Sequence, residues 1–130
     1  MDNRTINEHY NEVMHELIEE RPELEPLKYA DITIICLSSD ARKKSKGRKV
    51  LGLTEKIADK LKWSMPCDIT ITVFEPNVIG LNDEQIKILL FHELLHVGVD
   101  AEKPYIKPHD LEDFKLIIDE FGTDWAKPMF

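Results

Sequence analysis

Apolar residues recur at helical spacing between Asn82 and Gly98, and few polar positions interrupt them. The apolar positions are Ile86, Leu89, Leu90, Phe91, Leu94, Leu95 and Val97. Asn82 and Gln85 have the spacing of a capping box, and Gly98 is a natural C-terminal stop. Because the apolar surface covers most of the circumference, the pattern predicts a buried helix.

Two further segments also show helical periodicity. The first follows a capping box made by Thr5 and Glu8, and it predicts a helix over residues 6–20 that ends before a linker containing Pro22 and Pro26. The second begins after Pro108, with His109 or Asp110 near its N-cap. Its apolar stripe is Leu111, Phe114, Ile117, Ile118 and Phe121, and Gly122 ends it.

The strand predictions rest on two segments. Residues 30–37 are β-branched and nearly all apolar, which indicates a buried central strand. Residues 68–74 alternate strictly, with two threonines on one side, which predicts a half-buried strand at the sheet edge. Residues 50–53 suit a hairpin back to the first strand. Residues 54–63 fit either a short helix capped by Thr54 or a continuation of that strand.

Together these segments predict an α+β fold with about three mostly antiparallel strands. The 130 residues and the 42% hydrophobic content suit a single domain over residues 1–130. There is no apolar signal core at the N-terminus and no run long enough to cross a bilayer, so we expect a soluble, cytoplasmic protein without a membrane partner. Cys36 and Cys67 are expected to be buried, reduced thiols, while His9 and His15 are expected to face solvent.

The net charge of -8 argues against a surface that binds nucleic acid broadly. Residues 42–49 are a local exception, because they hold six basic residues and no acidic one, leaving -14 for the rest of the chain. A solvated loop tip explains such a run, and so does a loop that contacts phosphate or guides a substrate.

Chemistry concentrates in the buried helix, as the run His92-Glu93-Leu94-Leu95-His96. Residues four apart lie one turn above each other, so the two imidazoles converge on one point. Neutral imidazole is a preferred zinc ligand, and Glu93 is placed to act as a general base on a water there. Buried polar groups need partners, which a metal would supply. The alternative is two core histidines satisfied by backbone carbonyls, with the glutamate at the surface.

A catalytic zinc usually has a third protein ligand. The metzincin pattern requires glycine at position 99 and histidine at 102, but the chain has Val99 and Glu102. Later candidates are His109, Glu112, Asp113 and Glu120. We favour His109, because it lies at the start of the last predicted helix and away from its apolar stripe. Glu112 is the alternative.

The segment from Asp68 to Trp125 resembles the phage-type metallopeptidases, a group related to the SprT-like zincins. The resembling stretches are Asp68–Val73, Leu81–Gln85, His92–His96 and Lys107–Phe114. The resemblance implies that His92, His96 and His109 bind zinc, that Glu93 is the catalytic base, and that helices lie on one side of a compact sheet. Full SprT-like proteins often carry a cysteine-rich zinc ribbon, and this chain has no such cysteines.

We therefore predict a zinc-dependent metallopeptidase that hydrolyses peptide bonds through a zinc-bound water (cofactor Zn2+), with Glu93 as general base. Tyr105 is either an oxyanion stabiliser or a packing residue. Asp100, Asp110 and Asp113 are candidate acceptors for the ring N–H of the ligating histidines. Two alternatives remain: a non-catalytic zinc-binding adaptor or inhibitor module, and a SprT-like protease acting on DNA-bound proteins through the basic loop.

Overall fold

The computed structural model describes residues 2–64, 66–100 and 103–107. The α-helices are α1 (Glu8–Glu20), α2 (Glu25–Tyr29) and α3 (Asp83–Leu95), and the 3-10 turns are η1 (Pro22–Leu24), η2 (Asp59–Leu61) and η3 (Glu75–Asn77). The strands are β1 (Arg4–Ile6), β2 (Ile34–Ser39), β3 (Lys44–Ser45), β4 (Arg48–Lys49), β5 (Gly52–Lys56), β6 (Ile69–Phe74), β7 (Val97–Asp100) and β8 (Lys103–Ile106).

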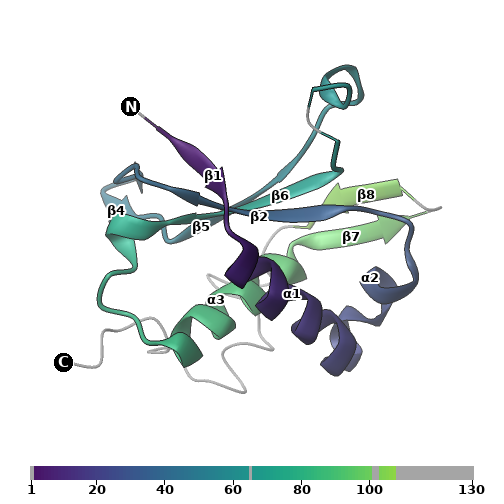
Figure 1. Cartoon of the computed structure of the whole chain (residues 1–130), viewed down its shortest axis with the longest axis horizontal. Helices are drawn as coiled ribbons and strands as arrows, with labels where there is room; N and C mark the ends of the chain where they lie inside the picture. Colours follow the sequence, from purple (N-terminus) through teal and green to yellow (C-terminus); the bar gives the residue numbers. More distant parts are fainter. Residues whose placement is uncertain (1, 65, 101–102, 108–130) are drawn as a thin grey trace.

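Within the described residues, the main sheet has four strands in the order β1-β2-β6-β5. The β2–β6 pair is parallel and the other two pairs are antiparallel. The α+β class and the central position of β2 are thus confirmed, with four strands where about three were predicted. Figure 1 shows α1, α2 and α3 on one face of this sheet.

The core fills the space between these helices and the sheet. It combines Met14 and Leu17 of α1, Ile71 of β6, and Leu90 and Leu94 of α3, all of them buried. The alternation of β6 explains this arrangement, because every second side chain faces the helices. Burial of these apolar side chains is the main favourable term that fixes α3 against the sheet.

Both cysteines lie in buried positions as free thiols. The Sγ atom of Cys36 lies 3.7 Å from the sulfur of Met14. Burial raises the pKa of the Cys36 thiol to about 12 and also raises the pKa of Cys67. These thiols therefore stay protonated and act as small apolar side chains, as the sequence predicted.

The N-terminal helix is confirmed, but its start was predicted wrongly. Thr5 belongs to β1, which pairs with β2, and Asn7 caps α1 by accepting a hydrogen bond from the backbone N–H of Tyr10 (2.9 Å). The helix therefore begins at Glu8. The linker after it is also more ordered than predicted, because Pro22 and Pro26 lie in the first turns of η1 and α2, where a proline loses no hydrogen bond.

The prediction of β6 as a half-buried edge strand is wrong. This strand lies between β2 and β5, and all six of its residues are buried. Arg4 covers the threonine face, because its Nη1 donates to Thr72 (3.2 Å) and its guanidinium lies 5.9 Å from the centre of the Phe74 ring. The alternation of apolar and polar residues along β6 predicted one apolar and one polar face. It could not show that Arg4 of β1 covers the polar face.

The segment after the basic run differs from one prediction and agrees with another. β5 pairs with β6 and not with the first strand, so the predicted hairpin is wrong. Of the two alternatives for the residues that follow, the continued strand is confirmed as far as Lys56, and no helix is capped by Thr54. The basic run forms its own hairpin of β3 and β4, which turns at Lys46 and Gly47, both with positive φ.

The predicted C-terminal helix lies outside the described residues. Among the described helices, none is long and apolar enough to cross a membrane.

Candidate metal centre

Helix α3 carries the candidate site and has the predicted N-terminus. The side chain of Asn82 accepts from the N–H of Gln85, and the side chain of Gln85 accepts from the N–H of Asn82, both at 2.9 Å. The C-terminus differs, because the helix ends at Leu95 with His96 as the C-cap, and Gly98 lies in β7. Gly98 leaves room for a neighbouring side chain: a Cβ atom there would overlap the ring of Tyr105, which would have to move.

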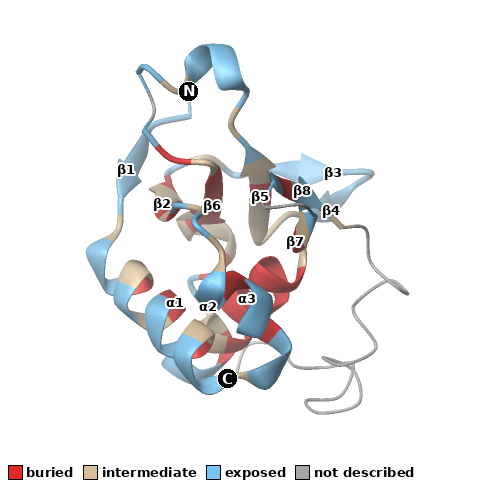
Figure 2. Cartoon of the chain, turned by 90° about the vertical axis from the view of Figure 1, so that its right-hand side faces the viewer, coloured by how far each residue is buried: buried red, intermediate tan, exposed pale blue. Residues whose placement is uncertain are grey.

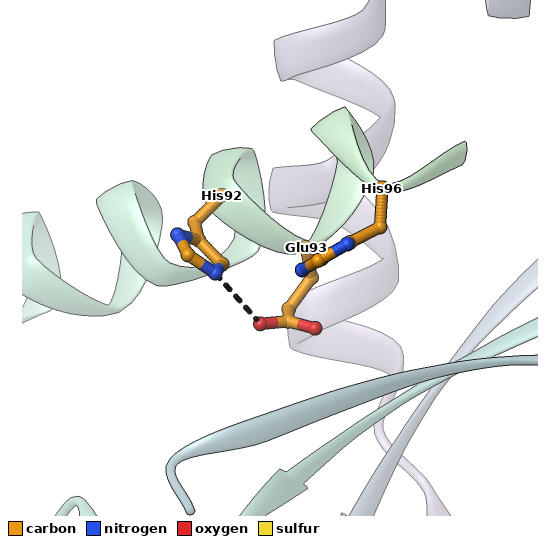
Figure 3. A group of neighbouring side chains, drawn as sticks. All are labelled: His92, Glu93 and His96. Atoms are coloured by element: carbon orange, nitrogen blue, oxygen red, sulfur yellow. Dashed lines mark ion pairs between the residues drawn. The ribbon is translucent and has the colours of Figure 1, made fainter. Parts of the chain in front are cut away.

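The last turn of α3 brings His92, Glu93 and His96 together. One potential ligand atom from each residue lies within 4.8 Å of the others. The two imidazole rings are 5.3 Å apart between centroids and nearly perpendicular, at 71°. Nε2 of His92 is 3.6 Å from Oε2 of Glu93. Figure 3 shows the three side chains leaving α3 toward the same region. The convergence predicted from the spacing of four residues is therefore present.

The carboxylate of Glu93 is buried, at 4% exposure, and strand β5 positions it. The hydroxyl of Thr54 lies 2.9 Å from Oε1 of Glu93 and 3.1 Å from its backbone carbonyl oxygen, so it can donate to either. Gly52 lies under the same side chain, where a Cβ atom would stand 3.2 Å from Cγ and 3.3 Å from Oε2 of Glu93. The alternative without a metal placed Glu93 at the surface, and that part of it is wrong.

The ring of His96 is oriented by the chain that follows β8. Nδ1 of His96 lies 2.6 Å from the carbonyl oxygen of Lys107, and the N–H of Lys107 donates to the carbonyl of His96 at 2.5 Å. Because a carbonyl only accepts, Nδ1 must carry the proton, and Nε2 then presents its lone pair. Figure 3 shows the far nitrogen of this ring on the side of Glu93.

Other predicted site residues have different positions. Asp100 is exposed in β7 and pairs in the ladder with Lys103, while Asp110 and Asp113 lie outside the described residues. His109, the predicted third ligand, and its alternative Glu112 also lie outside them. Tyr105 is 44% exposed and its ring lies against Gly98, which is the packing role.

The cluster fits a bound metal ion by the chemistry of its donors. Two imidazoles and a carboxylate, all nearly buried, meet on one turn of helix, and imidazole nitrogen and carboxylate oxygen are both metal ligands. The predicted solvent-facing histidines, His9 and His15, are exposed on α1.

The sequence did not indicate three groups that contact the site: Thr54, Gly52 and the Lys107 carbonyl. A glycine inside a strand does signal close approach of another group, but a backbone carbonyl carries no sequence signal.

Comparison with known protein families bears on what this cluster does. The model of one family, described as "putative phage metallopeptidase", matches residues 3–130. The chain belongs to this family. No curated protein and no solved structure matches it. Family membership and the His-Glu-His cluster together point to a metal ion and to a protein or peptide substrate.

Proposed function

We propose that this phage-type metallopeptidase is a zinc-dependent peptide hydrolase in which Glu93 is the general base. The observation that carries the proposal is the junction of α3 and β5. There, two imidazoles converge beside a buried carboxylate whose orientation is held by the hydroxyl of Thr54. A metal site with only a structural role has no need for a carboxylate held in this way.

The donor set favours zinc over magnesium and calcium. Imidazole nitrogen is a common zinc ligand, whereas magnesium and calcium prefer oxygen. We propose His92 and His96 as two protein ligands and retain His109 as the third. When bound, zinc supplies a Lewis acid that polarises a carbonyl and makes water more acidic.

In this proposal the protein's own groups move the proton. Glu93 accepts a proton from the attacking water and later returns it to the leaving amine. Thr54 keeps one carboxylate oxygen engaged, so the other is directed toward His92, 3.6 Å away. Burial of the carboxylate excludes bulk water from the proton transfer.

Strand β5 supports a peptide as the substrate. It is the last strand of the main sheet on its side in the described part of the chain. Such a strand offers backbone groups with which an extended peptide can pair. Gly52 and Thr54, which belong to this strand, contact Glu93. A peptide paired along β5 would thus lie beside the proposed base.

The decisive experiment replaces Glu93 with glutamine. Glu93→Gln should retain zinc, measured by plasma mass spectrometry, because both imidazoles remain. Cleavage of a proteome-derived peptide library should fall by about 10²–10⁴-fold, the usual contribution of a general base. Glu84→Gln, on the exposed first turn of the same helix, is the matched control and should leave cleavage unchanged.

Full activity of Glu93→Gln would refute the assignment of the base. Stoichiometric zinc in a wild-type protein that cleaves nothing in the library would instead favour the non-catalytic zinc-binding adaptor or inhibitor module. His109→Ala tests the third ligand separately, since it should lower the zinc content, whereas loss of zinc in Glu112→Ala alone would transfer that role to Glu112.

A further inference from the structure

The strongest charge feature outside the candidate metal centre is the basic hairpin, which we define as residues 42–49. It contains Arg42, Lys43, Lys44, Lys46, Arg48 and Lys49. All eight residues are exposed, and none of the six cations forms an ion pair with a described residue. Figure 2 shows β3 and β4 coloured as exposed at the border of the molecule. Among the described residues, the hairpin therefore presents a dense positive charge to solvent without a direct ion pair.

Its geometry holds like charges together. Lys44 and Lys49 are directly opposite each other in the β3–β4 ladder, an arrangement that is unfavourable for two cations. Lys46 adopts a φ of 52°, in the left-handed region that a residue with a Cβ rarely occupies. The repulsion between Lys44 and Lys49 would fall if one of them were neutral, so this pair keeps its charge at a local cost in stability. The cost at Lys46 is steric and does not depend on its charge.

The base of the hairpin is fixed to the end of β6 and to η3, the turn that follows it. The N–H of Val50 donates to the carbonyl of Lys43 at 3.0 Å. The side-chain amide of Asn77 donates to the carbonyls of Lys43 (2.9 Å) and Val50 (2.8 Å). Nζ of Lys43 lies 6.0 Å from the centre of the Phe74 ring. These contacts hold the two strands in a defined position, so the cations are displayed on an anchored ribbon.

We infer that the basic hairpin binds the phosphodiester backbone of a nucleic acid. The two residues that are not cationic are Ser45 and Gly47, so the hairpin has no aromatic or aliphatic anchor. Protein interfaces depend on such anchors, and a polybasic segment binds a membrane stably only together with a lipid chain or an apolar face. Contacts to phosphate need only cations and hydroxyl donors, and a two-stranded ribbon fits the major groove of a duplex.

The rest of the chain limits the contact to this surface. Outside the hairpin the formal net charge is -14, from -8 in total less the six cations, so other surfaces repel a polyanion. Binding should thus depend on few phosphate contacts, show little sequence preference and weaken strongly with salt. This inference goes beyond the proposed peptidase and depends on neither the metal nor Glu93.

The experiment measures fluorescence anisotropy of a short fluorescein-labelled DNA duplex across a range of potassium chloride concentrations. The wild type should bind with a log–log salt slope of about -0.9 for each phosphate contact. The variant Lys44→Gln/Arg48→Gln/Lys49→Gln should lose at least tenfold in affinity, and its slope should be shallower by about 2.7. A second variant, Lys44→Gln/Lys49→Gln, should shift the slope by about 1.8.

The matched control removes three exposed charges elsewhere, in Lys56→Gln/Lys60→Gln/Lys103→Gln. It should retain most of the affinity. Single-stranded DNA and an RNA duplex are used as further probes. The affinities for the three probes show which kind of nucleic acid the hairpin binds best. Glu93→Gln should bind like the wild type, which separates this inference from the proposed hydrolysis.

The inference is overturned if the wild type does not bind any of these probes at low salt, or if the control triple variant loses as much affinity as the hairpin variant. It is also overturned if sedimentation shows that the wild type self-associates, that the hairpin variant does not, and that the two bind DNA equally. The partner of the hairpin would then be the acidic surface of a second copy of the chain.

Discussion

At the scale of single residues, the candidate site depends on a hydroxyl that is distant in the sequence. Thr54 and Glu93 belong to β5 and α3, and the hydroxyl of Thr54 reaches both the carboxylate and the backbone carbonyl of Glu93. Thr54 is buried, so the contact is shielded from water. A hydrogen bond to a carboxylate is stronger in such a buried setting than in water. The position of the proposed base is therefore controlled by a residue outside the helix that carries it.

Thr54→Val should reveal this control, because valine keeps the shape and removes the donor. We expect kcat on a peptide substrate to fall about 10–100-fold, with zinc content unchanged. The free energy of unfolding should fall by about 1–3 kcal/mol, since a buried acceptor loses a partner. Steady-state kinetics and denaturant titration provide the two measurements.

Two further variants make the Thr54 result specific. Thr54→Ser keeps the hydroxyl and should recover most of kcat. Thr70→Val alters another buried threonine, on the opposite face of the main sheet, and should leave kcat unchanged. Equal kcat in Thr54→Val and the wild type would show that the hydroxyl does not position the base.

The residues of the site differ in how far the sequence could predict them. The convergence of His92 and His96 follows from helix geometry alone, so it could be predicted before any fold was known. The contact with Thr54 depends on which strand passes over α3, and the contact with the Lys107 carbonyl involves backbone. Neither is encoded in local spacing.

At the scale of elements, the β7–β8 ribbon links the end of α3 to the site. Val97 pairs with Ile106 and Gly98 with Tyr105, which carries the chain back so that Lys107 lies beside His96. Because α3 passes directly into β7, the ribbon and the last helical turn share His96 as their junction. The orientation of the His96 ring thus depends on correct pairing of this ribbon.

Gly98→Ala should disturb the ribbon, since the added methyl group would overlap the Tyr105 ring. We expect a loss of about 1–3 kcal/mol in the free energy of unfolding, as for other overpacked sites. Zinc affinity should fall as well, because displacement of the ribbon moves the Lys107 carbonyl away from His96. Chemical denaturation and competition with a zinc chelator give the two values.

The double variant Gly98→Ala/Tyr105→Ser provides the control for this contact. It removes the overlapping ring and should restore zinc affinity close to that of the wild type. If the double variant binds zinc as weakly as Gly98→Ala, the effect does not arise from the Tyr105 ring.

Single helices and strands were easier to predict than the way in which they pair. The apolar, β-branched run predicted β2 and the alternation predicted β6, because both patterns depend on local burial. Neither pattern could show that the two strands pair in parallel, nor that β1 takes up Thr5 and Ile6, which were predicted as the cap and the first residue of a helix. Those features depend on contacts between residues far apart in the chain. The capping box of α3, in contrast, is local, and it was predicted correctly.

At the scale of the whole molecule, opposite charges are separated. The basic hairpin is joined to the acidic remainder through Val50 and Leu51, which lead into β5 at Gly52. The strand that contacts Glu93 therefore begins next to the most basic surface described. Formal charge counts predict this asymmetry from sequence, but only the fold shows that the cations are anchored at one end of β5.

Metal binding should also stabilise the whole molecule, because the proposed ligands converge only when α3 is folded. An ion that binds the folded state alone adds about 2.7 kcal/mol when its free concentration is about 100 times its Kd. For a domain of this size that corresponds to a rise in Tm of roughly 10 °C. Scanning calorimetry of metal-free protein with increasing zinc measures it. His96→Ala should abolish the rise, whereas His15→Ala, at an exposed position on α1, should retain it. An equal rise in both variants would place the bound zinc away from α3.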